Sequence, residues 1–148
     1  AYLSERGVRV SGVDLSPRMI RHARQRYPHL DFAIASATTF DAPPESLGGV
    51  LGWWSLFNLP RQLLPGVLES FAEALVPGGQ IVIGTHVGDD DVVRTEAYGG
   101  IPVAWTTYLW RPEQLSRLIE GAGLKIIAEM RLPASGLRHP QVLIAARR

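Results

Sequence analysis

The sequence predicts a doubly wound α/β fold, in which helices cover a mostly parallel sheet and the last two strands pair antiparallel. Two observations support this prediction. Short apolar runs rich in β-branched residues alternate with longer stretches whose apolar residues recur at helical spacing, which indicates parallel strands with helical crossovers. Only the turn-rich stretch 133–140 separates the last two runs, so no crossover helix joins those strands. The length of 148 residues fits one domain, 1–148.

Each expected helix carries a start or a stop signal. Ser16 and Pro17 form an N-cap and first-turn pair, and Pro28 ends that helix. Pro77, followed by two glycines, ends the second helix, and Gly123 closes the third. The expected helices span 17–27, 64–75 and 112–122.

The expected strands are apolar runs that end at polar or turn-forming residues. The run 49–56 is apolar on both faces, which is typical of a central strand in a covered parallel sheet. Residues 39–48 are expected to be a polar loop, and 87–111 a long, irregular insert that contains aromatic residues. The expected strands span 8–14, 30–35, 49–56, 80–85, 124–131 and 141–146.

The first residues have the pattern of a helix end. Tyr2 and Leu3, followed by charged residues and then Gly7, match a last helical turn with glycine just after it. Because a helix does not begin with its last turn, we expect further residues before Ala1. Roughly 40–60 of them would supply a strand, a tight glycine turn and most of a helix.

Composition excludes several classes of function. Fifteen basic against fourteen acidic residues give a net charge of +1, which argues against nucleic acid as the main partner. The hydrophobic fraction of 46% excludes a disordered chain. The chain has no cysteine, so it has no disulfide, thiolate metal site or thiol nucleophile. No apolar run approaches the ~18 residues that span a bilayer, and we expect a cytoplasmic protein without a membrane partner.

Ligands of doubly wound sheets bind at the carboxyl ends of the strands. The first such end, at Asp14, offers a carboxylate that either accepts hydrogen bonds from the vicinal hydroxyls of a ribose or only favours the helix that starts at Ser16. At the next strand end, Ser36 and Ala37 either leave room for a flat ring beside one hydroxyl or form a plain polar loop.

Two further strand ends carry aromatic groups. Trp53 and Trp54 are adjacent, so alternation along a strand sends their rings to opposite faces. Either one of them packs in the core while the other lines a pocket and meets a cation, or both belong to the core. His86 is placed for acid–base chemistry, although a lone histidine is more often solvated or satisfied. The acidic run 89–91 is expected to be a solvated loop, and no metal site is predicted.

Three strings occur in a fixed order: VSGVDLSPRMI at 10–20, LVPGGQIVI at 75–83 and LIEGAGLKI at 118–126. Together they resemble the class I S-adenosylmethionine-dependent methyltransferases in residues, order and spacing, and the likeness covers essentially the whole chain. Segments 49–60 and 108–112 are also similar to a small bacterial branch of this family. The resemblance implies a Rossmann-like methyltransferase fold with S-adenosylmethionine as its cofactor.

The resemblance also implies the site residues. One position matches the acid that holds the cofactor ribose, four match positions near the adenine, and two match the segment beside the methionine end. In that order they are Asp14; Leu15, Met19, Ser36 and Ala37; and Trp53 and Trp54.

The implied function is methyl transfer to a small-molecule acceptor. Because the sulfonium already makes the methyl group electrophilic, the protein chiefly has to align the acceptor and exclude water. His86 is the candidate catalytic base, and the insert 87–111 is the expected acceptor lid. The expected acceptor contacts on the insert are Tyr98, Trp105 and Tyr108.

One departure from the family keeps two alternatives open. The family's central first strand and its glycine-rich loop would precede Ala1, and without them strands 8–14 and 49–56 would each have one unpaired edge. A non-catalytic methyltransferase-like fragment is therefore one alternative. The other is a nicotinamide-dependent oxidoreductase, in which Asp14 would also hold a ribose.

Overall fold

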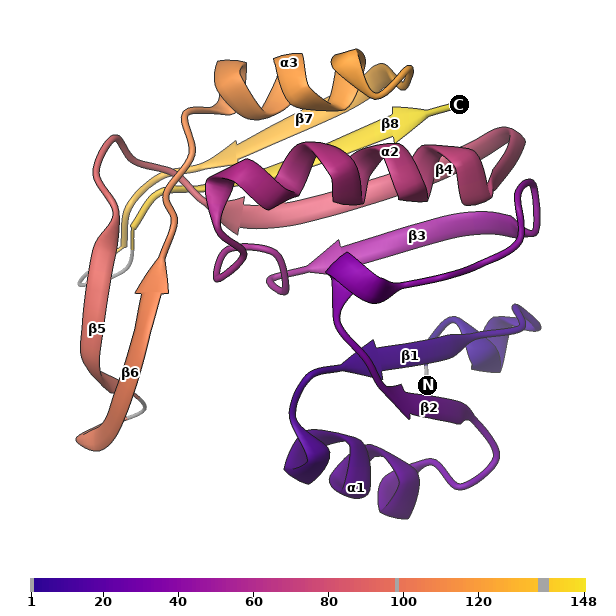
Figure 1. The fold of residues 1–148 in the computed structure, drawn as a ribbon, viewed down its shortest axis with the longest axis horizontal. Helices are drawn as coiled ribbons and strands as arrows, with labels where there is room; N and C mark the ends of the chain where they lie inside the picture. The colour runs from indigo at the N-terminus through magenta and orange to yellow at the C-terminus, as the bar shows by residue number, and fades with distance from the viewer. Residues whose placement is uncertain (1, 98, 136–138) are drawn as a thin grey trace. The chain divides into compact units, whose positions relative to one another are not determined.

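The computed structural model describes residues 2–97, 99–135 and 139–148. They form two compact units that divide after Phe40. We call them the N-terminal unit, up to Phe40, and the C-terminal unit, 41–148, and describe each by itself (Figure 1). Among the described residues, no helix has the length and apolar character needed to cross a membrane.

The N-terminal unit is a parallel strand pair with one α-helix. Its strands pair along their whole length, starting with Ser11 opposite Asp31. A short 3-10 turn precedes them, and Gly7 ends it in the left-handed conformation, with its N–H donating to the Ser4 carbonyl, as the glycine signal predicts. The elements are η1 (Ser4–Arg6), β1 (Ser11–Asp14), α1 (Pro17–Arg26), β2 (Asp31–Ile34) and η2 (Ala37–Thr39).

Helix α1 begins where its cap residues predict. The Ser16 hydroxyl accepts a hydrogen bond from the Met19 N–H at 3.3 Å, and Pro17 occupies the first turn. Arg24 donates from Nε and Nη2 to the Phe32 carbonyl at 3.1 and 2.6 Å. This arginine therefore fastens α1 to β2.

The C-terminal unit is built on a four-stranded sheet in the order β3-β4-β8-β7. Strands β3 and β4 are parallel, and β8 is antiparallel to both of its neighbours, which confirms the antiparallel C-terminal strand pair. The elements are β3 (Leu47–Trp53), η3 (Arg61–Leu63), α2 (Leu64–Ala74), β4 (Leu75–His86), β5 (Val92–Ala97), β6 (Ile101–Thr107), α3 (Pro112–Gly121), β7 (Lys125–Leu132) and β8 (Gln141–Arg147).

The core of this unit lies between the sheet and its two helices. Helices α2 and α3 lie over one face of the sheet, where α2 contacts β4 and α3 contacts β7 and β8 (Figure 1). Alternate residues of the two middle strands point into this layer, and burying such apolar side chains is the main stabilising term of the fold. The side chains with less than 2% exposure include Ile81, Ile83, Val142, Ile144, Leu68, Leu115 and Ile119.

The insert 87–111 differs from the prediction. It was expected to be irregular, but β5 and β6 form an antiparallel hairpin within it. Its β-branched residues favour extended backbone, and Gly99 and Gly100, both with positive φ, lie between the two strands. The hairpin signal was present in the sequence, but Pro102 within the second strand argues against a strand and concealed it.

Strand β3 also differs from the prediction of a covered central strand. Leu51 and Trp53 are 54% and 56% exposed. Within the described residues, β3 pairs only with β4 and β1 only with β2, which matches the expected unpaired edge on each of these strands. Strand β4 starts at Leu75, directly after α2, so the turn expected at 77–79 lies inside the strand, with Gly78 at φ 80°.

Candidate active site

Asp14 lies at the carboxyl end of β1 with one carboxylate oxygen unused. Its Oδ1 accepts a hydrogen bond from the Ser16 N–H at 2.7 Å, which is the helix-start role. Its Oδ2 has no partner among the described residues, and the side chain is exposed. The structure therefore gives Asp14 its structural role and also leaves an acceptor for a hydroxyl group of a ligand.

Leu15 and Met19 present apolar surface beside this carboxylate. Leu15 is 70% exposed and Met19 56% exposed, on the segment that enters α1 and on its first turn. Exposed apolar side chains next to an unused carboxylate oxygen suit a ligand with a flat ring and a hydroxylated sugar, so these residues fit the nucleoside part of the expected cofactor.

Ser36 has a local role at the end of β2. Its hydroxyl accepts the Thr38 N–H at 3.1 Å and shares a hydrogen bond with the Thr38 hydroxyl at 2.8 Å, so it caps η2. This matches the plain polar loop of the sequence-based alternatives. Ala37, the first residue of η2, is partly buried and offers only its small size.

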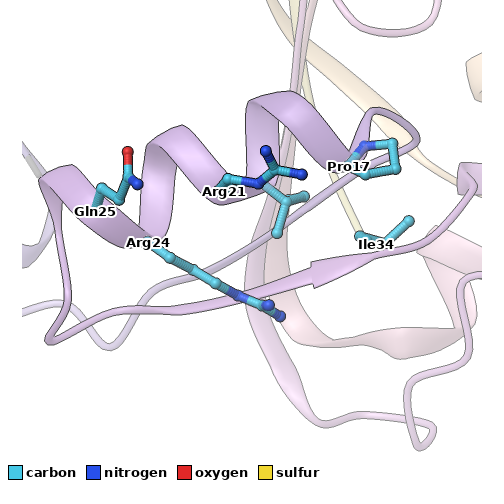
Figure 2. A pocket seen from close by; sticks show the side chains of 6 residues that line it. Pro17, Arg21, Arg24, Gln25 and Ile34 are labelled. Carbon is cyan, nitrogen blue, oxygen red and sulfur yellow. The ribbon is translucent and has the colours of Figure 1, made fainter.

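A shallow pocket of about 380 Å³ also lies in the N-terminal unit (Figure 2). It runs along α1 and contains none of the predicted cofactor contacts. The guanidinium of Arg24 at its edge is already bonded to the Phe32 carbonyl. The residues that line it are Pro17, Ile20, Arg21, Arg24, Gln25 and Ile34.

Trp53 and Trp54 lie together at the end of β3, and the expectation that their rings point to opposite faces is wrong. The ring centroids are 4.6 Å apart with an interplanar angle of 70°. Trp54 has a φ of 47°, in the left-handed region that bulky residues rarely adopt. This conformation breaks the alternation of side chains along the strand, so the two rings pack edge to face against each other.

Gly84 of β4 makes room for the second ring. The Trp54 N–H donates to the Gly84 carbonyl at 3.1 Å, which continues the β3–β4 ladder past the last strand residue. A Cβ at position 84 would lie 2.7 Å from Trp54 Cζ3 and 3.1 Å from Leu143 Cδ2. The left-handed Trp54 is therefore held by a backbone hydrogen bond and by a strand position where only glycine fits.

His86, the last residue of β4, completes a group of rings. Its ring centroid lies 5.2 Å from that of Phe57, 6.3 Å from Trp54 and 6.4 Å from His139. We call Trp53, Trp54, Phe57, His86 and His139 the aromatic cluster. Because β4 and β8 pair with His86 opposite Gln141, the residues just before β8 reach the carboxyl end of β4.

The environment of His86 keeps its imidazole neutral. Burial lowers its pKa below the usual 6.5, and the nearby His139 and Arg94 lower it further. Nδ1 is buried without a hydrogen-bond partner among the described residues. Nδ1 therefore has no group among these residues with which to exchange a proton. Nε2 of the neutral ring is the atom left to act on a ligand.

Sequence reasoning did not single out Phe57 or His139 as site residues. Phe57 follows the predicted tryptophan pair by three residues, and the predicted antiparallel pairing of the last two strands brings 133–140 to the same sheet end as His86. That register was the signal that could have located His139. The Val87 N–H, which donates to the Pro140 carbonyl at 2.7 Å, holds this loop against the end of β4.

The hairpin is attached to the aromatic cluster at its base. The Tyr108 N–H donates to the Phe57 carbonyl at 2.7 Å, and the partly buried Trp105 pairs with Arg94 in the β5–β6 register. Tyr108 is also partly buried. Tyr98, the third expected acceptor contact, lies outside the described residues.

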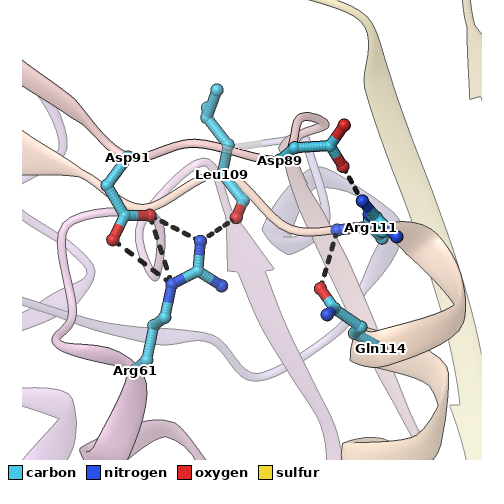
Figure 3. Close-up of polar contacts among 6 residues, drawn as sticks. All are labelled: Arg61, Asp89, Asp91, Leu109, Arg111 and Gln114. Carbon is cyan, nitrogen blue, oxygen red and sulfur yellow. Dashed lines mark hydrogen bonds and ion pairs between the residues drawn. The ribbon is translucent and has the colours of Figure 1, made fainter.

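Arginine–aspartate pairs fix both ends of the insert (Figure 3). Arg61 donates to both carboxylate oxygens of Asp91 and to the Leu109 carbonyl, and its guanidinium carbon lies 4.4 Å from the Trp110 ring centroid. The second pair joins Arg111 to Asp89. The acidic run 89–91 is an exposed loop, as expected, and two of its three residues are also ion-paired.

The comparison with protein families decides the class. Residues 1–79, just over half of the chain, match the family model described as "Methyltransferase domain". The chain belongs to the methyltransferase domain family. The alternative of a nicotinamide-dependent oxidoreductase therefore falls away, and S-adenosylmethionine is the methyl donor of enzymes with this class I fold.

Solved structures confirm the fold of this methyltransferase. An S-adenosylmethionine-dependent methyltransferase from Methanosarcina mazei is 12% identical, with a TM-score of 0.86 over 99% of this chain and 85% of that one. One from Mesorhizobium loti is 16% identical, with a TM-score of 0.78 over 99% and 84%. The 1,6-didemethyltoxoflavin-N1-methyltransferase of Burkholderia thailandensis, solved with 1,6-didemethyltoxoflavin and S-adenosylhomocysteine, is 20% identical, with a TM-score of 0.76 over 99% and 64%.

Proposed function

We propose that this methyltransferase acts on a small-molecule acceptor, which the aromatic cluster binds. The aromatic cluster carries the proposal, because it combines aromatic rings packed edge to face with one neutral imidazole at the carboxyl ends of two parallel strands. The similar protein from Burkholderia thailandensis holds a small molecule, 1,6-didemethyltoxoflavin.

The cofactor contacts belong to the N-terminal unit. Asp14 Oδ2 accepts hydrogen bonds from the ribose hydroxyls, while Leu15 and Met19 contact the adenine. Ser36 contributes the shape of its capped turn, because its hydroxyl is already bonded within η2. When bound, S-adenosylmethionine supplies an electrophilic methyl group on a positively charged sulfur.

The chemical roles belong to the C-terminal unit. His86 takes a proton from the acceptor at Nε2, because its Nδ1 is buried and its lowered pKa keeps the ring neutral near pH 7. The faces of Trp53 and Trp54 suit a positively charged group such as the sulfonium. The hairpin with Trp105 and Tyr108 covers the acceptor and excludes water.

The ribose contact has a direct test with a matched control. Asp14→Ala in the full-length protein should weaken S-adenosylhomocysteine binding about tenfold, the lower range for hydrogen bonds to an exposed charged group. Asp31→Ala is the control, because Asp31 lies opposite Ser11 at the other end of the β1–β2 pair. Isothermal titration measures both, and equal dissociation constants for the two variants would disprove the ribose assignment.

The remaining expectation concerns location. We propose that the protein works in the cytoplasm, because a chain without cysteine suits a reducing compartment. Immunodetection in fractionated cells tests this.

A further inference from the structure

The two ends of the insert lie side by side at the end of β4. Val87 forms a parallel bridge with Trp110, whose N–H donates to the His86 carbonyl at 3.3 Å. The Gly88 N–H donates to the Trp110 carbonyl at 3.4 Å. A Cβ at Gly88 would lie 2.5 Å from Leu109 Cδ1, so the two ends of the insert pack at a distance that only glycine permits.

Residues 108–110, which we call the anchor segment, are also bonded to the loop after β3. The Tyr108 N–H donates to the Phe57 carbonyl at 2.7 Å. The Phe57 ring in turn lies 5.2 Å from the His86 ring, measured between centroids. The anchor segment therefore holds the backbone of both residues of this ring pair, and a shift of the segment would move the two rings.

Arg61 of η3 holds the anchor segment in place (Figure 3). Its Nη2 donates to the Leu109 carbonyl, and its guanidinium carbon lies 4.4 Å from the Trp110 ring centroid. Its Nε also donates to both carboxylate oxygens of Asp91, at 3.2 and 3.3 Å, on the other arm of the insert. Leu109 and Trp110 are buried. One arginine side chain therefore fastens both arms of the insert to η3.

These contacts need a guanidinium rather than any positive charge. A planar guanidinium carries five N–H donors and stacks on an aromatic face, so it serves a carbonyl, a carboxylate and a ring at once. A lysine ammonium is a compact charge on a flexible stem, which can pair with Asp91 but cannot make all three contacts together. Arg61→Lys therefore separates the geometry of these contacts from their charge.

We infer that Arg61 is a positioning residue for methyl transfer, because it holds the anchor segment to which Phe57 and His86 are bonded. This inference rests on the proposed function, in which His86 takes a proton from the acceptor. Arg61 acts through the N–H groups of Tyr108 and Trp110 and exchanges no proton itself. Proton transfer needs Nε2 within about 2.6–3.2 Å of the acceptor atom, and a misplacement of about 1 Å can cost roughly a hundredfold in rate.

Arg148 provides a matched control for the loss of such contacts. Its Nη1 donates to the Leu75 carbonyl, and its Nη2 lies 3.1 Å from a carboxylate oxygen of Glu45. Its side chain is 33% exposed, against 31% for Arg61. Leu75 is the first residue of β4, so these contacts lie at the opposite end of that strand from the aromatic cluster. Arg148→Lys should therefore cost similar stability without disturbing the cluster.

A proton NMR titration of the ligand-free, full-length protein tests this role, with the His86 signal identified by its loss in His86→Gln. In Arg61→Lys the anchor segment should loosen and water should reach the imidazole. Because burial is the largest cause of the lowered pKa of His86, that pKa should rise towards 6.5. Arg94 and His139, the other groups that lower it, are present in every variant. Arg148→Lys should leave the pKa as in the wild type. An unchanged pKa in Arg61→Lys, or an equal rise in both variants, overturns the inference.

A third variant shows which contact of Arg61 positions His86. Asp91→Asn removes the ion pair but leaves the guanidinium on the Leu109 carbonyl and the Trp110 ring, so the pKa of His86 should not rise. A rise as large as in Arg61→Lys would place the effect in the outgoing arm of the insert and overturn the role of the anchor segment.

Cofactor binding separates this inference from the proposed function. By isothermal titration, Arg61→Lys should bind S-adenosylhomocysteine as tightly as the wild type, because the proposed ribose and adenine contacts belong to the N-terminal unit. A tenfold loss in this variant would make Arg61 a determinant of the whole fold and overturn its specific role. Failure of the wild-type protein to bind S-adenosylhomocysteine would instead refute the proposed function, whatever the titration of His86 shows.

Discussion

Replacing Gly84 with alanine should displace the Trp54 ring. The new Cβ would lie 2.7 and 2.9 Å from two ring carbons of Trp54 and 3.1 Å from Leu143 Cδ2, closer than carbon atoms approach without repulsion. The ring cannot simply rotate, because its backbone is held at φ 47° and it packs against Trp53. Overpacking of this kind costs roughly 1–3 kcal/mol in the free energy of unfolding.

Gly48→Ala is a matched control on the neighbouring strand. A Cβ at Gly48 meets nothing within 4 Å, and its φ is not positive, so alanine there should be neutral or slightly stabilising. Thermal unfolding followed by circular dichroism compares the two variants, with a drop of roughly 3–4 °C for each kcal/mol lost by Gly84→Ala. Tryptophan fluorescence should change in Gly84→Ala alone.

A double-mutant cycle identifies the source of the loss. In a Trp54→Ala background, Gly84→Ala should cost much less than in the wild type, because the ring that blocks the Cβ is absent. If Gly84→Ala costs the same stability in both backgrounds, the penalty does not come from contact with Trp54. The conclusion that Gly84 makes room for that ring is then refuted.

Two other perturbations probe His86 and the base of the hairpin. Because the pKa of His86 in the folded protein lies below its usual 6.5, the unfolded chain binds the proton more readily, so stability should fall as pH drops below about 6.5. This fall should be smaller in His86→Phe than in the control His29→Gln. Urea unfolding at several pH values measures it, and the same dependence of stability on pH in both variants would count against a neutral His86. Arg61→Lys should lose the forked contact with Asp91 and lower the free energy of unfolding by about 1 kcal/mol. Amide hydrogen exchange across 87–111 should rise in this variant, whereas in the control Arg117→Lys it should stay as in the wild type.

Features with local causes were predictable from the sequence. Helix α1 starts at the Ser16 cap, and α3 is followed by Gly123 at φ 82°, because the residues that end a helix act on backbone groups one turn away. The parallel and antiparallel strand pairs followed from the presence or absence of a helix between the runs. These inferences needed no knowledge of distant contacts.

Features that depend on distant residues were not predictable in this way. The left-handed turn at Trp54 needs Gly84, thirty positions later, to leave space for its ring, so alternation alone gave the wrong result. His139 reaches His86 only through the β4–β8 register. The hairpin in the insert was missed for a different reason, since Pro102 lies within its second strand and argues against a strand there.

The charge of the site also shows why composition excludes partners better than it identifies ligands. A net charge of +1 argues against a polyanionic partner, but it says nothing about where unpaired charges remain. In the insert, Asp89 pairs with Arg111 and Asp91 with Arg61, whereas no ion pair of Arg94 is found among the described residues. The charges that remain available to a ligand are therefore those left after neighbouring pairs have formed, which only the three-dimensional arrangement determines.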